Sequence, residues 1–231
     1  MAKLLIDFKW QRDREGYRLA DAEPERLGDP YIHPLHPEWG PQPPQLMMRS
    51  PAKPQRVVGR SRRCEKIQPL DGPRGGSLFA TFANAATTPE GVLDFINRYG
   101  PLTTMETGYE PVPWVIEHAQ AMRDFIEAAG GRSRVADIVG TEEIPLSGMN
   151  TAIVWDKNIK GPRLRFSPHN LIDALWMQLA YGLSTGVCAR ECRQCGAIFT
   201  AGPGTPRRGD AEFCSPEHQI LFNSLKRRRG R

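Results

Sequence analysis

The stretch ARECRQCGAIF, residues 189–199, decides how the C-terminal part of this 231-residue chain must fold. Cys192 and Cys195 are separated by two residues, and a tight turn of this length brings both sulfur atoms to the same side, where they can bind one tetrahedral metal ion. Gly196 follows the second cysteine, and the turn can close there because glycine has no Cβ to clash. The stretch therefore predicts one half of a metal site.

A second pair of candidate ligands lies in EFCSPEHQ, residues 212–219, with eighteen residues between Cys195 and Cys214. Ser215-Pro216-Glu217 is typical of a helix start, a capping residue followed by proline in the first turn. Cys214 and His218 are four positions apart, the spacing at which two side chains share one face of a helix. Both can therefore reach the same ion from the first helical turn.

The two pairs predict a closed site for one structural zinc ion, with Cys192, Cys195, Cys214 and His218 as its ligands. Cys188 is the alternative to His218 as the fourth ligand. A CxxC pair alone would also suit a redox dithiol, but a second pair at a workable distance favours metal. The cysteine count of five is odd and no secretion signal is found, which argues against a disulfide framework.

A module of this size also needs a metal ion. Residues 188–231 contain few core-sized apolar side chains, so burial alone cannot stabilise them. Zinc binding, which contributes about 10–16 kcal/mol in finger peptides, supplies that stability. After the cysteine turn the sequence predicts a hairpin, formed by a strand-like AIFT and a chain that returns through Ala211-Glu212-Phe213, and then a helix. This order is treble-clef-like.

The net charge of the chain is concentrated in the same module. The whole chain has 31 Lys+Arg and 26 Asp+Glu, a formal charge of +5, and residues 188–231 hold nine of the basic and four of the acidic side chains. The rest of the chain is therefore neutral overall. A basic cluster of this kind favours contact with a polyanion such as DNA, with RNA as the other candidate. The predicted nucleic-acid contacts are Arg207, Arg208, Lys226, Arg227, Arg228, Arg229 and Arg231.

The C-terminal helix carries most of this charge. We expect it to turn its apolar side chains inward, namely Ile220, Leu221, Phe222 and Leu225. A helix stiffened by a zinc site could then present its basic residues to a groove. Gln219 and Asn223 are the amides on this helix, but no spacing in the sequence selects either of them as a base-reading residue.

Ahead of the zinc module the sequence predicts an α+β body, residues 78–187, which is mainly helical and contains one hairpin. Residues 151–166 give the hairpin, because apolar and polar residues alternate on both sides of a turn. A last helix follows, and its start is predicted at Ser167 as the capping residue and Pro168 in the first turn. Gly182 is the predicted end of that helix.

Two earlier helices are expected in the body. Thr88-Pro89-Glu90 is a helix start, and Gly100-Pro101 ends that helix after Tyr99. A longer helix is expected over residues 113–129, where apolar residues recur at intervals of three and four and form one stripe. These helices supply most of the predicted core.

The first 77 residues differ in composition from the rest. Nine prolines fall within Pro24–Pro54, which excludes a helix or a central strand there. Short strand-like pieces occur at residues 4–10, 17–19 and 56–58. We interpret residues 1–77 as an extended N-terminal segment that packs on or flanks the body.

No other grouping of polar residues predicts a reactive centre. Residues 71–77 form a glycine-rich loop, but the Lys-Ser/Thr of a phosphate-binding loop is missing. No nucleophile, base and orienting group come together, so the sequence predicts no enzyme. The remaining histidines and carboxylates of interest suit surface or capping positions better, and they are His33, His36, Glu38, His118, Glu142, Glu143 and His169.

Residues 192–231 resemble the C-terminal zinc finger of bacterial CGNR-type proteins. The resemblance rests on the CxxCG turn with Phe199 after it, the basic Gly-rich loop, Phe213-Cys214-Ser215 and the Arg-rich helix. It implies a transcription regulator with a helical α/β body ahead of the finger, and the same four zinc ligands. The Cys-Gly-Asn-Arg motif of that family would fall at residues 218–221, where one ligand differs and Gly-Asn-Arg is absent. Residues 77–103 also look like bacterial proteins that carry such fingers.

Taken together, these features predict a cytoplasmic, bacterial, zinc-binding protein that binds DNA and regulates transcription. No run of about 18 apolar residues occurs, so no membrane partner is expected. The body is expected to sense a ligand, to form a homodimer or to bind a protein partner. The alternative class is a protein–protein adaptor or an antitoxin-like subunit, in which zinc is purely structural.

Overall fold

The structure is a computed structural model of the chain. It describes residues 5–6, 8, 10–21, 55–61, 63–68, 77–103, 109–130, 149–156, 160–203 and 205–229. Several features predicted from the sequence lie outside these residues, namely the proline-rich stretch within Pro24–Pro54, most of the glycine-rich loop at 71–77, Glu142-Glu143 and Arg231.

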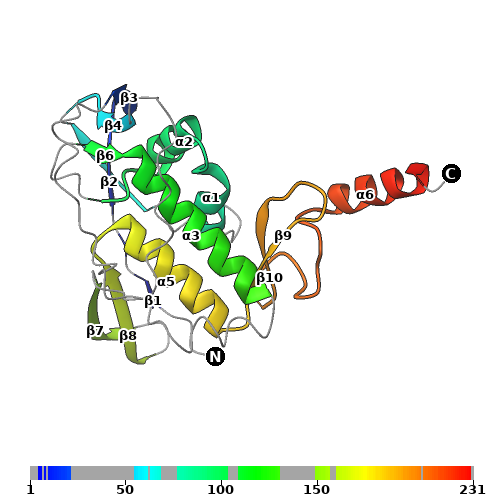
Figure 1. Cartoon of the computed structure of the whole chain (residues 1–231). Helices are drawn as coiled ribbons and strands as arrows, with labels where there is room; N and C mark the ends of the chain where they lie inside the picture. Colours follow the sequence, from blue (N-terminus) through cyan, green and yellow to red (C-terminus); the bar gives the residue numbers. More distant parts are fainter. Residues whose placement is uncertain are drawn as a thin grey trace.

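The described residues combine helices with small sheets, as the predicted α+β class requires (Figure 1). The strands are β1 (Leu5–Ile6), β2 (Trp10–Asp13), β3 (Tyr17–Asp21), β4 (Gln55–Gly59), β5 (Cys64–Ile67), β6 (Tyr109–Pro111), β7 (Met149–Asp156), β8 (Gly161–Pro168), β9 (Cys188–Glu191) and β10 (Ile198–Ala201). The helices are α1 (Leu78–Ala85), α2 (Pro89–Tyr99), α3 (Val112–Gly130), α5 (Leu171–Ser184) and α6 (Pro216–Arg229).

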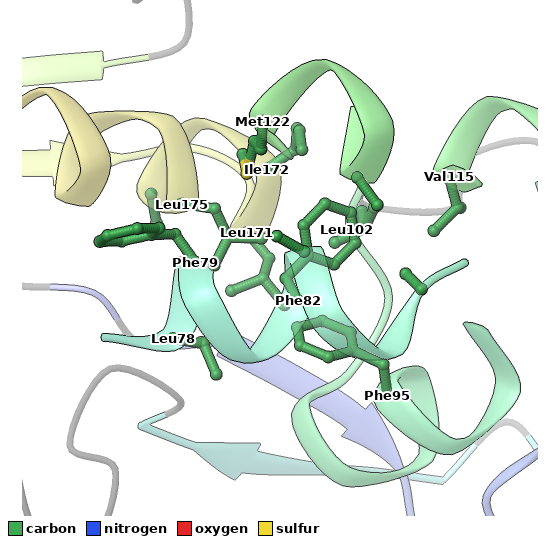
Figure 2. Packing of buried hydrophobic residues seen from close by; sticks show 14 of the residues in the cluster. Leu78, Phe79, Phe82, Phe95, Leu102, Val115, Met122, Leu171, Ile172 and Leu175 are labelled. Carbon is green, nitrogen blue, oxygen red and sulfur yellow. The ribbon is translucent and has the colours of Figure 1, made fainter. Parts of the chain in front are cut away.

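The core of the body lies between α1, α2, α3 and α5, whose apolar faces meet (Figure 2). Phe79 and Phe82 of α1 are at most 2% exposed and lie beside Leu171 of α5. Burying a side chain of this size contributes about 1.5–3 kcal/mol, so a few such residues outweigh most surface contacts. The predicted apolar stripe of α3 is confirmed, because each of its described members is at most 1% exposed: Val115, Ala119, Met122 and Ile126.

Helix α2 begins and ends as its sequence predicts. The Thr88 hydroxyl accepts a hydrogen bond from the Gly91 backbone N–H at 3.1 Å, and Pro89 occupies the first turn. Gly100 ends the helix with φ +84, a left-handed conformation that favours glycine. A Cβ on Gly100 would also lie 2.8 Å from the Gln11 backbone oxygen, so the helix end packs directly on β2.

The predicted hairpin is confirmed as β7 and β8, but the start predicted for the next helix is wrong. Pro168 pairs opposite Met149, so Ser167 and Pro168 belong to β8. Pro168 ends the strand, where it breaks no interior ladder bond. Helix α5 begins at Leu171, with Asn170 as its N-cap residue, and runs past Gly182 to Ser184.

The end of α5 lies two residues beyond the one predicted. Gly186, with φ +82, supplies the left-handed conformation that follows the helix. The Thr185 hydroxyl donates to the Tyr181 and Gly182 carbonyl oxygens, which also accept bonds from the Thr185 and Val187 backbone N–H groups at the helix end.

Strands from the first part of the chain join the same core as the helices. Trp10, Tyr17 and Val57 are at most 8% exposed and belong to the core cluster. β3, β4 and β6 form one antiparallel sheet and β2 pairs with β5, while β1 runs parallel to β8. The Trp10 indole N–H donates to the Pro101 carbonyl oxygen at 2.6 Å, which ties β2 to the residues after α2.

Buried polar groups connect these strands. Asp13 is 5% exposed, and its carboxylate accepts bonds from the Ser61 N–H and hydroxyl, both at 2.6 Å, and from the Glu15 N–H. Burial raises the pKa of Asp13, but these hydrogen bonds outweigh it and leave the pKa below its ordinary value. His118 was expected in a surface or capping role, and that expectation is wrong: it lies within α3, is 4% exposed and accepts a bond from the Trp176 indole.

One face of the β7–β8 hairpin exposes large apolar side chains. Ile153 and Trp155 of β7 are 78% and 68% exposed, and Leu164 of β8 is 47% exposed. Ile153 lies directly opposite Leu164 in the ladder, so the two side chains share one face.

None of the described helices combines the length and the apolar composition that a membrane span requires.

The buried carboxyl of Glu110, in β6, holds the chain that follows α2. It accepts hydrogen bonds from the Leu102 N–H at 2.9 Å and the Thr103 N–H at 2.5 Å. Leu102 in turn accepts a bond from Ile172 at the start of α5. Burial raises the pKa of Glu110 to about 7, although these two backbone bonds oppose the shift.

This pKa predicts a specific pH dependence of stability. The folded protein keeps the Glu110 proton up to about pH 7, whereas the unfolded chain releases it near its ordinary pKa of 4.5. The free energy of unfolding should therefore fall by roughly 3 kcal/mol as the pH rises from 4.5 to about 7. Glu110→Gln cannot titrate and should lack this component, which urea unfolding of both proteins at several pH values will measure. Parallel pH profiles for the two proteins would contradict the assignment.

Candidate metal centre

Strands β9 and β10 pair antiparallel, and the cysteine turn joins them. The Gly196 N–H donates to the Cys192 carbonyl oxygen at 2.8 Å, and the Cys192 N–H donates to Ala197 at 2.9 Å. Gly196 has φ +69, which confirms that the turn needs a residue free to adopt a left-handed conformation. Cys192 and Cys195 are thereby fixed at the end of a hairpin rather than on a free loop.

The position of the hairpin differs from the prediction. The turn was expected to precede a hairpin, but it is itself the hairpin turn, between β9 and β10. Within the described residues, no strand follows between β10 and α6, and Ala211-Glu212-Phe213 is irregular. The sequence AIFT predicted a strand where β10 lies, but it did not indicate the partner strand β9, which precedes the cysteines.

Helix α6 supplies the other half of the site. It begins at Pro216, and the Ser215 hydroxyl accepts a hydrogen bond from the His218 N–H at 3.2 Å, which confirms the predicted helix start. The cap fixes the first turn, so the His218 ring faces Cys214, with 3.0 Å between Nδ1 and Sγ.

The four predicted ligands come together. The Sγ atoms of Cys192, Cys195 and Cys214 and a ring nitrogen of His218 all lie within 4.8 Å of one another. The Cys195 and Cys214 sulfurs are 3.9 Å apart, and Cys192 Sγ is 3.7 Å from His218 Nδ1. A tetrahedral zinc ion with Zn–S bonds of about 2.3 Å would space two sulfurs about 3.8 Å apart. The donor set and its spacing therefore fit one zinc ion.

The structure also distinguishes between the two candidates for the fourth ligand. Cys188 lies at the start of β9, paired with Ala201, and its thiol approaches the Gly186 carbonyl oxygen at 4.0 Å. It is not part of the ligand cluster, which contains His218 instead. The cysteines are free thiols, and 3.9 Å is far beyond the length of a disulfide bond.

The electrostatics of the cluster favour a bound cation. Burial raises the pKa of Cys192, but N–H groups of Cys214, Gln194 and Cys195, together with His218, outweigh it and bring the pKa to about 6. Cys214 is shifted the other way, to a pKa of about 12, by burial and by the two neighbouring cysteines. One thiolate thus forms readily, and a second one beside it needs a positive charge.

Two polar side chains of the body hold the hairpin of the metal centre, beside the apolar contacts of Ala189 and Ile198 with the core. The Asn84 side chain, at the end of α1, donates to the Ile198 carbonyl oxygen at 2.8 Å and accepts from the Ile198 N–H at 2.7 Å. Arg123 of α3 donates to the Ala83 and Gly196 carbonyl oxygens, at 3.2 and 3.3 Å. The cysteine turn is therefore attached to two helices of the body.

The predicted basic residues lie along the loop and the helix. Arg208 and residues 226–228 are exposed, and Arg229 ends α6. Arg207 is half-buried instead, and its Nε donates to the Cys214 carbonyl oxygen at 3.0 Å, so it helps to close the loop over the metal centre. Sequence reasoning did not select Arg193, which pairs with Glu212 at 2.8 Å and lies over the Phe222 ring.

The expectation that α6 turns its apolar residues inward is wrong for most of them. Ile220, Leu221 and Leu225 are 69%, 46% and 38% exposed. Only Phe222 packs on the module, with its ring centroid 5.3 Å from that of Phe213. Because α6 extends away from the body, one aromatic contact and the metal ligands are its main attachments in the described structure (Figure 1).

The fold and the site define a mixed helix-and-sheet protein with a Cys3His centre that can hold one metal ion. Comparison of the chain with protein-family models, with curated proteins and with solved structures gives no match. The resemblance of residues 192–231 to CGNR-type fingers therefore stays a prediction from the sequence, and the metal centre rests on its own geometry.

The first prediction from this site concerns proton competition. Zinc must displace the proton of Cys214, so the apparent affinity should rise at least about tenfold for each pH unit between pH 6 and 8. Competition with a chromophoric chelator measures this affinity. Cys214→Ser should lose most of the binding, whereas Cys188→Ser should bind one zinc ion per chain with unchanged affinity. Equal losses in the two variants would contradict the ligand set.

A second prediction concerns the attachment of the hairpin to the body. Asn84→Ala leaves the Ile198 N–H and carbonyl without their partner, and should lower the free energy of unfolding by about 1–3 kcal/mol. Urea unfolding of the zinc-loaded protein measures the change. Gln120→Ala is the matched control, because that amide bonds Asp124 on an exposed part of α3 and should matter by less than about 0.5 kcal/mol. Equal effects of the two substitutions would refute the role of Asn84.

Proposed function

We propose that the protein is a zinc-dependent DNA-binding protein that acts as a bacterial transcription regulator. The observation that carries this proposal is the arrangement of α6: its first turn belongs to the Cys3His centre, and its other end carries exposed basic residues away from the body (Figure 1). A projecting basic helix anchored at one end is a common means of approaching a nucleic acid.

The charge on this surface matches that of a phosphate backbone. Lys226, Arg227 and Arg228 are consecutive and exposed, so they point to different sides of the helix. Arg208 adds an exposed charge on the loop that precedes α6. Contacts of this kind position a protein on DNA and provide affinity without sequence preference.

Zinc has a structural role in this proposal. The ion would be held by Cys192, Cys195, Cys214 and His218, and when bound it supplies the positive charge that the thiolates require. All four ligands come from the protein, so the tetrahedral shell is complete. The metal therefore fixes the direction of α6 relative to the β9–β10 hairpin, and the hairpin is in turn held by Asn84.

An adaptor or antitoxin-like subunit is the second candidate, and one observation favours it. The β7–β8 hairpin exposes Ile153, Trp155 and Leu164 on one face, and exposed apolar side chains gathered in this way are typical of a protein contact. In that case zinc would only stabilise the C-terminal module, and the basic helix would bind an acidic partner. The two candidates differ in whether the isolated protein binds DNA.

The test is a titration of labelled duplex DNA at two salt concentrations. If about four phosphates are neutralised, the affinity of the zinc-loaded protein should fall roughly a hundredfold between about 50 and 200 mM salt. Replacing Lys226, Arg227 and Arg228 with alanine should weaken binding and remove about three units from the slope of log affinity against log salt.

A matched control neutralises three exposed arginines of the body, Arg14, Arg18 and Arg60, near strands that lie away from α6 (Figure 1). This variant has the same net charge as the α6 variant and should bind DNA like the unchanged protein. Equal weakening in both variants would mean that binding follows total charge. No binding at the lower salt concentration would reject the proposal and favour the adaptor.

A further inference from the structure

One exposed face of α6 carries side chains whose types the fold does not explain. Gln219, Asn223 and Lys226 follow one another at intervals of four and three, so they lie along one side of the helix. Ile220 and Arg227 lie on the same side, three residues before and four residues after Asn223. All five side chains are exposed, and Ile220 is 69% exposed.

A neighbouring side of α6 is the one that meets the metal centre. His218 joins the ligand cluster and Phe222 packs on Phe213. Folding of the module therefore uses His218 and Phe222, and it leaves Gln219, Ile220 and Asn223 outside that contact. An apolar residue as exposed as Ile220 contributes little to the stability of the module, so its side chain is accessible to another molecule.

A groove runs beside this face. It has a volume of about 670 Å³, and α6 lines it with Gln219, Phe222, Asn223 and Lys226 while the cysteine turn adds Arg193 and Gln194. The edge of the groove that the cysteine turn forms is held in place. The Arg193 guanidinium donates to Glu212 at 2.8 Å and lies 5.3 Å from the Phe222 ring centroid. Amides and cations from two separate elements thus converge on one groove.

We propose that this face, Gln219–Ile220–Asn223 with Lys226, enters the major groove of duplex DNA and reads A·T base pairs; the inference rests on the proposed DNA-binding function. An asparagine or glutamine amide donates to N7 of adenine and accepts from its N6 amino group. The exposed Ile220 provides an apolar surface for the thymine methyl group. Lys226 and Arg193 contact phosphates at the rim of the DNA major groove.

The dimensions of α6 favour duplex DNA over RNA. A helix of 14 residues is about 21 Å long and about 10–12 Å across, which matches a B-form major groove about 12 Å wide. The deep and narrow major groove of A-form RNA does not admit a helix. Because α6 extends away from the body, the body does not obstruct its entry (Figure 1).

The experiment is a selection of bound sequences from a random duplex library with the full-length, zinc-loaded protein. We expect the unchanged protein to enrich a site that contains A·T pairs. Asn223→Ala should lose the preference at the base pair it reads, and its affinity for the selected site should fall about ten- to hundredfold. Its affinity for an unrelated duplex should change by less than about twofold, because its phosphate contacts remain.

Leu221→Ala is the matched control, since Leu221 is also exposed but lies on another side of α6. It should select the same site as the unchanged protein. Duplex binding without any enriched sequence, or an unchanged site in Asn223→Ala, would overturn the inference and leave the proposed function standing. Preferred binding of an RNA hairpin would also overturn it. If no nucleic acid is bound at all, the proposed function fails, and the inference fails with it.

Discussion

The C-terminal part of this protein depends on one electrostatic constraint. Three cysteine sulfurs and an imidazole lie within 4.8 Å of one another, and the pKa of Cys214 shows that a second thiolate beside Cys192 is unfavourable without a cation. A cation bound there would allow a hairpin and a helix with one aromatic contact between them to form a fixed unit. The direction of α6, and therefore everything its exposed residues can contact, follows from that cluster.

The constraint reaches the body through polar contacts as well as through Ala189 and Ile198, which lie in the core cluster. Asn84 satisfies both backbone groups of Ile198, and Arg123 links the end of α1 to the carbonyl oxygen of Gly196. Hydrogen bonds have strict geometry, so they fix the orientation of the hairpin on the body more closely than apolar packing would. A molecule that binds the body and displaces α1 or α3 would therefore move the metal centre as well.

The sequence predicted those features whose determinants are close together in the chain. The spacing of Cys192, Cys195, Cys214 and His218 indicated the ligand set, with Cys188 left as the alternative to His218. Thr88-Pro89 with Gly100 was sufficient for α2. Features that depend on distant partners were missed. Ser167 and Pro168 look like a helix start, but pairing with β7 holds them in a strand, and Asn84 acts on Ile198 through a contact that no local pattern indicates. The exposure of Ile220 could not be predicted either, because an apolar residue on a helix is normally buried.

The parallel pairing of β1 with β8 has a consequence for the order of folding. Leu5 lies opposite Arg165, so β1 can be placed only after β8 has been synthesised. Closing so long a loop is slow, whereas the hairpin and the metal centre involve residues that are close in sequence. The order of synthesis and the order of assembly are therefore opposed at β1. β1 leaves the ribosome before β8, yet it can reach its native neighbour only after β8 has been synthesised.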